Sequence, residues 1–127
     1  MRSVIVAAAL VAAMLLAGCA GGQDPRSQLS NAPDIGITHG VWDAYTKDYL
    51  GEHTPLAFAV SENGEVYFYY YCEAIRCINL NSNEAITRAI SGCQNRGQGQ
   101  CVLFAAERSP PRKHHFIDDF SQRLKSP

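Results

Sequence analysis

The 127-residue chain lacks the sequence signatures of common catalytic and cofactor-binding sites. It has no Gly-rich phosphate loop, no G-x-S-x-G nucleophile elbow, no H-E-x-x-H metal motif and no C-x-x-C-H haem-attachment motif. A catalytic cysteine must be an unpaired thiol with a lowered pKa, and the cysteines of this chain are expected to pair. We therefore predict no catalytic residue, no cofactor and no metal site, and we expect a protein that is not an enzyme.

The chain also lacks an excess of charge of either sign. It carries 11 Lys and Arg against 12 Asp and Glu, for a formal net charge of −1. Nucleic acids are bound largely through clustered positive charge. This balance gives no electrostatic reason to expect a nucleic-acid partner.

No apolar run in the first part of the chain is long enough to cross a bilayer. The run at residues 4–16 is shorter than the roughly 20 residues that a membrane-spanning helix needs. It follows Arg2 and ends in small residues, which is typical of a secretory signal peptide. We predict that residues 1–18 are such a signal.

The end of this segment resembles the lipobox of bacterial lipoproteins. In that family Leu, a small residue, Gly or Ala and an invariant Cys follow one another, and here Leu16, Ala17, Gly18 and Cys19 fill the pattern. The resemblance implies cleavage before Cys19, a diacylglyceryl group on its sulfur and acylation of its new amino group. Ala20, in place of Asp, implies sorting to the outer membrane. The alternative is an ordinary secreted protein whose signal ends in Cys.

A lipid anchor on Cys19 would make the membrane the first partner of this protein. Buried acyl chains contribute about 0.8 kcal/mol per CH₂, so two or three of them hold a protein without a spanning helix. The expected location is the cell envelope, at the periplasmic face of the outer membrane. An envelope protein or cell-wall glycan is the expected further partner.

The five cysteines become an even set of four once Cys19 is lipidated. In an oxidising compartment an even set favours disulfides. We favour pairing within two local pairs, although other connectivities stay open: Cys72–Cys77 and Cys93–Cys101. The alternatives are a zinc site, whose pairs typically have two to four intervening residues, and a thiol-redox motif with two; the gaps here are four and seven.

The mature chain divides by composition into three parts. Residues 19–40 are rich in Gly, Pro, Ser, Asn and Asp and are predicted to be a flexible tether. Residues 41–108 are predicted to form the globular domain. Residues 109–127 are predicted to be a tail, in which Phe116, Ile117, Phe120 and Leu124 could line one face of a short helix.

The pattern within residues 41–108 predicts a small α+β domain of β-β-α-β order with a preceding short helix. Apolar residues at helical spacing predict a helix at 41–50. Two β-prone runs around Asn63-Gly64 predict a hairpin. Asn81, with Glu84 three positions later, predicts the start of a helix ending near residue 97, and residues 101–107 predict a third strand. Residues 55–107 are also similar to small exported bacterial domains of uncharacterised function with a C-x-L-F-A strand, filled here by Cys101, Leu103, Phe104 and Ala105.

The second hairpin strand carries the most distinctive side chains in the sequence. Tyr67, Tyr69 and Tyr71 alternate with Val66, Phe68 and Tyr70, so each set lies on one face. Because both faces are apolar, we expect the strand to be central or covered on both sides. If the tyrosine face is open, it is a candidate platform for a sugar or a peptide; the alternative is that the Trp42 helix or the C-terminal segment covers it.

One other cluster of ligand-type side chains occurs, at His114 and His115 beside Arg112 and Lys113. Adjacent histidines in an extended segment point apart, and a short basic stretch is usually solvated. The sequence thus predicts a lipid-anchored, non-enzymatic accessory or binding module. Two alternatives stay open: thiol-redox or metal handling through the four cysteines, and glycan or peptidoglycan binding through Tyr67, Tyr69 and Tyr71.

Overall fold

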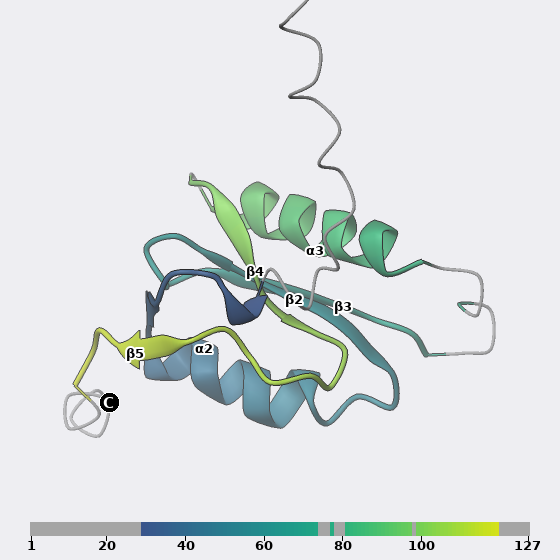
Figure 1. Ribbon diagram of the computed structural model, residues 1–127, viewed down its shortest axis with the longest axis horizontal. Coiled ribbons are helices and arrows are strands. Elements are labelled where there is room, and N and C mark those ends of the chain that lie inside the picture. The colour runs from purple at the N-terminus through teal and green to yellow at the C-terminus, as the bar shows by residue number, and fades with distance from the viewer. Residues whose placement is uncertain (1–28, 74–76, 78–80, 98, 120–127) are drawn as a thin grey trace, which may run out of the picture.

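The computed structural model describes residues 29–73, 77, 81–97 and 99–119. These residues form a disulfide-stapled α+β domain, as predicted, with helices on both sides of a sheet (Figure 1). The elements in chain order are β1 Ile35–Ile37, α2 His39–Asp43, the π-helix η1 Ala44–Tyr49, β2 Pro55–Ser61, β3 Tyr67–Tyr71, α3 Ser82–Arg96, β4 Cys101–Ala106 and β5 His114–Phe116. No helix in the described part of the chain has the length and apolar character that crossing a membrane would require.

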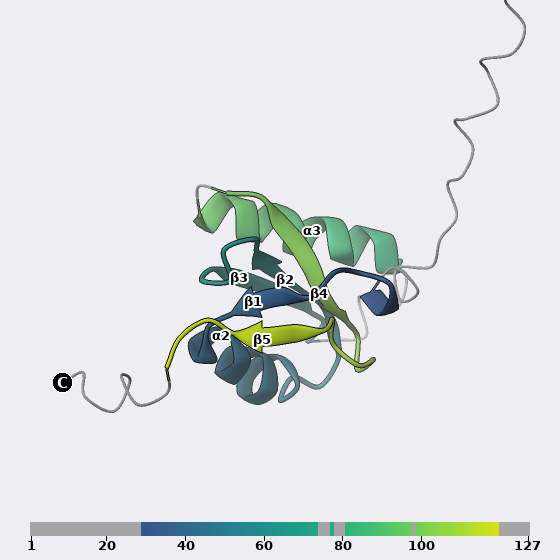
Figure 2. The same cartoon turned by 60° about the vertical axis from the view of Figure 1, so that its left-hand side comes forward.

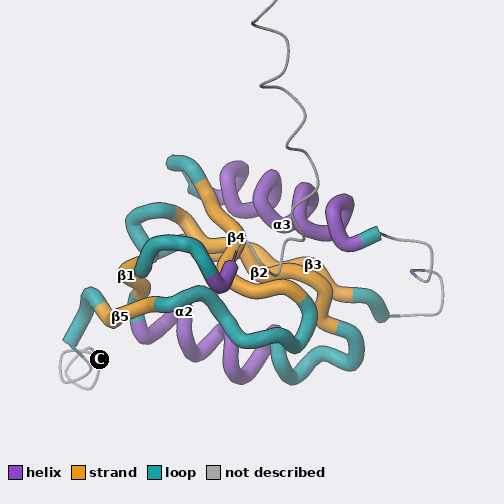
Figure 3. Tube along the Cα trace, viewed as in Figure 1, coloured by secondary structure: helices purple, strands orange, loops and turns teal. Residues whose placement is uncertain are grey.

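The main sheet has three antiparallel strands in the order β3-β2-β4. Helix α3 packs on one face of this sheet, and α2 with η1 lies on the other (Figure 3). Side chains of β2 alternate between these faces. Phe58 and Val60 join the cluster on the η1 side, while Ala57 and Ala59 join the cluster on the α3 side.

The predicted hairpin is confirmed, with a turn that depends on one glycine. Gly64 has φ +77°, and a Cβ at this position would overlap the carbonyl of Gly36. The carboxamide of Asn63 accepts a hydrogen bond from the Glu65 N–H at 3.2 Å, as in an Asx turn. Gly64 therefore supplies the left-handed backbone that the turn needs. It also lets the turn approach the end of β1 closely, where the Gly64 carbonyl accepts a hydrogen bond from the Thr38 N–H at 3.0 Å.

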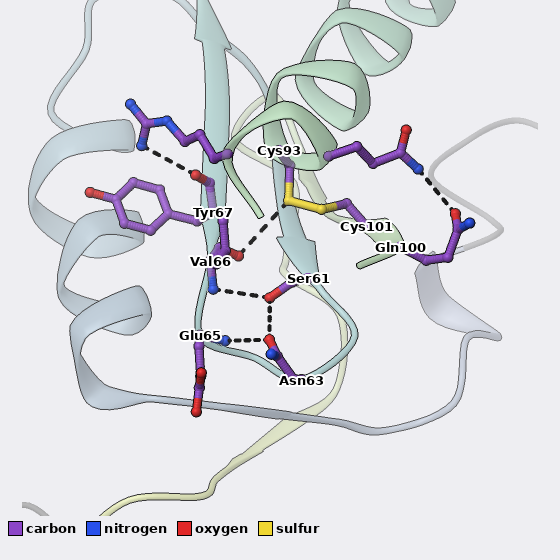
Figure 4. The surroundings of a disulfide bond; sticks show 10 residues. Ser61, Asn63, Glu65, Val66, Tyr67, Cys93, Gln100 and Cys101 are labelled. Carbon is purple, nitrogen blue, oxygen red and sulfur yellow. Dashed lines mark hydrogen bonds between the residues drawn. A yellow bond between two sulfur atoms is a disulfide. The ribbon is translucent and has the colours of Figure 1, made fainter. Parts of the chain in front are cut away.

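Helix α3 and both disulfides follow the predictions. The Asn81 side chain accepts from the Glu84 N–H at 2.7 Å and caps the helix. The pairs Cys72–Cys77 and Cys93–Cys101 have Cα–Cα distances of 5.9 and 6.1 Å, within the usual disulfide range. The second bridge ties the last turn of α3 to the first residue of β4 (Figure 4).

The predicted helix at 41–50 is present, but its hydrogen bonding changes along its length. It begins as α2 at His39 and continues as the π-helix η1 from Ala44 to Tyr49. Tyr45 and Tyr49 are buried, whereas Trp42 is only partly buried. The rings of these two tyrosines are stacked, with centroids 5.6 Å apart, and both lie edge to face with the ring of Phe58 in β2.

The prediction of a tether through residue 40 is wrong for residues 29–40. Leu29 is 5% exposed and Ile37 is fully buried, and β1 belongs to a two-stranded parallel sheet with β5 (Figure 2). The polar composition of this stretch hid two isoleucines at alternate positions. The rest of the predicted tether, with Cys19, lies outside the described residues.

The predicted C-terminal tail helix is also wrong for the described residues up to 119. His114–Phe116 form β5, and Ile37 accepts a hydrogen bond from the Ile117 N–H at 3.0 Å. The spacing of Phe116 and Ile117 predicts a helix, but pairing with β1 across almost eighty residues decides the conformation here. Phe120 and Leu124 lie outside the described residues.

Strand β3 is not the central strand, so the first of our two alternatives for it, a central strand or one covered on both sides, is wrong. β2 is the central strand, and β3 lies at the sheet edge. All five residues of β3 are half-buried because α3 packs against one face and η1 only partly covers the other. Apolar side chains on both faces of a strand therefore indicate that it packs between two layers. They do not indicate whether the strand is central or at the edge of its sheet.

Candidate functional site: the tyrosine edge

The candidate binding surface lies along the edge strand β3. We call Tyr67, Tyr69 and Tyr71, together with Arg96 at the end of α3, the tyrosine edge. The structure brings the three predicted tyrosines onto one face, as the strand alternation requires. Tyr67 and Tyr69 pack against the cluster on the η1 side, whereas Phe68 and Tyr70 pack against the cluster on the α3 side.

The tyrosine rings are held in a regular array by the residues beneath them. The Tyr67 and Tyr69 rings are nearly parallel, at 4°, with centroids 6.5 Å apart. The ring of Phe58, on the neighbouring strand, is parallel to both, at centroid distances of 5.5 and 6.0 Å. Tyr49 covers Tyr69 from below, edge to face at 5.9 Å. The tyrosine row is thus fixed on its core side and half-exposed on its outer side. This result lies between the two alternatives that the sequence left open, a fully open tyrosine face and a covered one.

Arg96 was not among the residues predicted for this site. Its guanidinium lies 5.7 Å from the ring centroid of Tyr67 and 5.2 Å from that of Phe68, within cation–π range. Its Nη1 also donates to the Tyr67 carbonyl at 3.3 Å. A hollow of about 280 Å³ lies beside it, lined by Tyr67, Phe68, Tyr69, Tyr71 and Arg96. The only sequence feature that could have pointed to Arg96 is its place as a basic residue in the last turn of a capped helix. Basic residues are common there because they interact favourably with the helix dipole, so the feature is not specific for a binding site.

The two ends of the tyrosine edge differ in charge. Arg96 provides a positive charge at the Tyr67 end. At the other end the Tyr71 hydroxyl donates to the Glu73 carboxylate at 2.9 Å, and this hydrogen bond raises the pKa of Tyr71. Desolvation, followed by the negative charge of Glu52, raises the pKa of Tyr69. Both hydroxyls therefore stay protonated at neutral pH and can donate hydrogen bonds.

The histidines of the C-terminal stretch do not form a joint site. His114 and His115 point apart along β5, as predicted for an extended segment. The His114 ring lies against Trp42, at 4.7 Å between centroids, and its Nδ1 lies 2.8 Å from the Arg112 carbonyl. His115 pairs with Asp34 instead. In the part of the chain that the structure describes, no group of three or more His, Cys, Asp or Glu residues could hold a metal ion.

Three of the four predicted disulfide cysteines are buried, and the fourth, Cys77, is partly buried. Cys93 is fully buried, and Cys72 and Cys101 are 6% and 7% exposed. Cys77 is partly buried and is bonded to Cys72. A thiol that attacks a substrate must be accessible as a thiolate, and this arrangement offers none in the disulfide form.

A second, larger hollow of about 510 Å³ lies between α3, β4 and the segment that begins at Leu29. Its lining includes the apolar Ile86, Ile90 and Leu103 and the charged Arg112. The Arg112 Nε donates to the Pro33 carbonyl at 2.8 Å, which ties this side chain to the fold. The hollow has apolar walls but lacks the array of aromatic rings that the tyrosine edge presents.

Comparison with protein-family models, with curated proteins and with solved structures gave no significant match to this chain.

Proposed function

We propose that this protein is a non-enzymatic, lipid-anchored binding module of the cell envelope, and that the tyrosine edge is its ligand surface. The resemblance of residues 16–19 to a lipobox supports the anchor on Cys19. The two disulfides, Cys72–Cys77 and Cys93–Cys101, support an oxidising compartment. The periplasmic face of the outer membrane is the proposed location.

The observation that carries the proposal is the half-exposed row of tyrosine rings beside a hollow. The rings are fixed before any ligand arrives, because Phe58 and Tyr49 pack beneath them. Little conformational entropy is then lost on binding. Tyrosine also combines an apolar ring with a hydroxyl donor.

Cell-wall glycan is the ligand class that this surface suits best. Sugar rings present apolar C–H faces that can lie on aromatic rings, and their hydroxyls can pair with tyrosine hydroxyls and with Arg96. The spacing of 6.5 Å between the Tyr67 and Tyr69 centroids allows successive contacts along an extended chain.

A pull-down with isolated cell-wall material tests the ligand surface. Tyr71→Ala removes a ring that is outside the two core clusters, so we expect loss of binding by tenfold or more with little change in melting temperature. Tyr70→Ala is the matched control, because the neighbouring ring lies on the α3 side. Equal retention by Tyr71→Ala and the parent protein would refute the ligand surface.

Two further measurements test the anchor and the redox alternative. Cys19→Ser should remove the acyl mass and release the protein from membranes into the soluble fraction. Alkylation of the extracted protein without reductant should add no groups, and alkylation after reduction should add four. Alkyl groups added before reduction would instead favour thiol chemistry at the four cysteines.

A further inference from the structure

The outer edge of β3 presents backbone groups that β2 does not use. The Ser61 N–H donates to the Val66 carbonyl at 2.8 Å, and Val60 is paired with Tyr67. In an antiparallel ladder, residues that bond to the neighbouring strand alternate with residues whose N–H and C=O point away from it. Phe68 and Tyr70 therefore bond to β2, and the backbone of Tyr67, Tyr69 and Tyr71 faces outward.

This edge has few of the features that usually prevent strands from pairing between molecules. Lys, Pro and bulges are the common protection. The sequence of β3, YFYYY, contains no charged residue and no proline, and the β2–β3 pairing has one irregularity, on the β2 side between Pro55 and Ala57. Arg96 reaches one outward group, the Tyr67 carbonyl, at 3.3 Å. The hollow beside Arg96 is lined by residues of both faces of β3, which places it at the edge itself.

The opposite edge of the same sheet is protected. The Arg112 N–H donates to the Phe104 carbonyl of β4 at 2.8 Å, so the segment leading to β5 covers part of that edge. Among the residues that the structure describes, the segment leading to β5 thus bonds to one edge of the sheet, while Arg96 alone reaches the outward backbone of the other.

We propose that the β3 edge binds a second copy of this chain, with the two β3 strands antiparallel and Tyr69 on the two-fold axis. This register places Tyr67 opposite Tyr71 of the second copy and pairs all three outward-facing residues. An isologous contact of this kind closes on itself. The two three-stranded sheets would become one continuous sheet.

Charge complementarity is the observation that selects a second copy as the occupant. The positive Arg96 lies at the Tyr67 end, and Glu73 lies at the Tyr71 end. At about 3.3 Å per residue, these ends are roughly 13 Å apart within one chain, so their charges do not pair there. The antiparallel register brings each Arg96 toward the Glu73 of the other copy, twice in each dimer. In the same register Glu65 comes opposite Glu73 of the second copy, a like-charge pair. Glu65 lies in the hairpin turn outside β3, and its side chain points away from Tyr67 (Figure 4).

This inference goes beyond the proposed function, because it concerns self-association rather than ligand choice. It has a consequence for that function, since two tyrosine rows would form one surface. The two can fail separately. Loss of cell-wall binding with an intact dimer would refute only the ligand surface, whereas a monomer that binds cell wall would refute only the dimer.

A charge-exchange experiment tests the pairing. The full chain, extracted from membranes in detergent, is measured by native mass spectrometry as the parent and as Arg96→Glu and Glu73→Lys variants. The parent should be dimeric. Each variant alone should dimerise at least about tenfold more weakly, because like charges then meet twice. An equal mixture should restore dimers, since every facing pair between the two variants is of opposite charge.

Arg88→Glu is the matched control for this experiment. Arg88 is an exposed arginine on α3 that lies over Tyr70, 5.4 Å from the ring centroid, on the other side of β3. The control should dimerise as the parent does. A monomeric parent, a mixture that stays monomeric, or an equal loss in Arg88→Glu would each overturn the proposal.

Cysteine cross-linking tests the register without changing a charge. Hydrogen-bonded residues on facing antiparallel strands have Cα atoms about 5.5 Å apart, which suits a disulfide. Tyr69→Cys should therefore cross-link to itself in oxidised envelopes. Tyr71→Cys should not, because it would face Tyr67. Cross-linking of Tyr71→Cys in preference to Tyr69→Cys would overturn the register.

Discussion

The two faces of the main sheet are packed in different ways. On the α3 face the buried residues are small, and they are Ala57, Ala59, Ala85, Ala89, Cys93 and Cys101. On the η1 face most of them are large, and they include Tyr45, Tyr49, Phe58 and Phe104. One strand, β2, supplies alanines to the first face and Phe58 and Val60 to the second.

This difference reflects what covers each face. A single capped helix covers the α3 face, and small side chains let it approach the sheet closely; a Cβ on Gly92 would overlap the ring of Phe68. The η1 face is covered by short segments from distant parts of the chain. They are joined by long-range bonds such as Tyr49 Oη to the Glu107 carbonyl at 2.8 Å. Burial at this contact raises the pKa of Tyr49, so the hydroxyl remains a donor. One face is thus encoded locally, and the other is assembled from distant segments.

The largest effect is expected on the assembled face. Phe58 is fully buried and contacts the rings of Tyr45, Tyr49 and Phe104. Phe58→Ala should lower the free energy of unfolding by about 3–5 kcal/mol, because it removes a large core side chain and leaves a cavity. Chemical denaturation measures this loss. Ile90→Ala, on a half-buried residue of the α3 face, should cost clearly less; equal losses would contradict the comparison.

The next effect is expected from the staple of the α3 face. Replacing Cys93 and Cys101 together by Ala should lower the free energy of unfolding by about 2–3 kcal/mol, the chain-entropy value for a loop of this size. Replacing Cys72 and Cys77 should cost less, since Cys93 is fully buried and Cys77 is only partly so. Thermal unfolding of both variants shows which disulfide contributes more to stability. A larger loss on removal of Cys72–Cys77 than on removal of Cys93–Cys101 would contradict this prediction.

A smaller effect tests the close approach of α3. Gly92→Ala should destabilise by about 1 kcal/mol net. Overpacking against Phe68 costs about 1–3 kcal/mol, and the higher helix propensity of Ala returns about 1 kcal/mol. Ser91→Ala is the control, because Ser91 is exposed on the same turn and should be neutral or stabilising. Stabilisation by Gly92→Ala would show that Phe68 moves aside freely.

The smallest effect concerns the hydrogen bonds between Asp118, near the C-terminal end of the described chain, and His39 of α2. Desolvation raises the pKa of Asp118, but hydrogen bonds from the His39 backbone and ring, each at 2.8 Å, outweigh it and hold that pKa below its ordinary value. The ionised carboxylate therefore stabilises the fold above about pH 4, and this contribution is lost as the pH falls through the lowered pKa. The melting temperatures of the parent and Asp118→Asn should converge toward pH 3. A constant difference across this range would contradict the assignment, and Glu62→Gln, exposed in the hairpin turn, is the control.

The same division explains how much of the structure could be predicted from the sequence. The hairpin, α3, β4 and the cysteine pairs have local signals: Asn63-Gly64, the Asn81 cap and short cysteine spacings. The β1–β5 sheet has none, because two three-residue strands at opposite ends of the domain carry no periodicity. The edge position of β3 was missed because side-chain pattern reports faces, not neighbours in the sheet. The tyrosine row was predicted from alternation, whereas Arg96 and Glu73 at its ends depend on tertiary folding.

The parallel pairing of β1 with β5 has a mechanical consequence. Ile35 N–H donates to the Lys113 carbonyl and Ile117 N–H donates to the Ile37 carbonyl, at 3.1 and 3.0 Å, and the two strands run in the same direction. The chain therefore enters at one end of this pair and leaves at the other. A pull between residues 34 and 117 acts along the strands and loads these bonds together, in shear, instead of opening them one by one. If the protein is anchored at its N-terminal end as proposed, a force applied at the C-terminal end would load the β1–β5 pair first. This pair joins the two ends of the domain, and it would resist unfolding there.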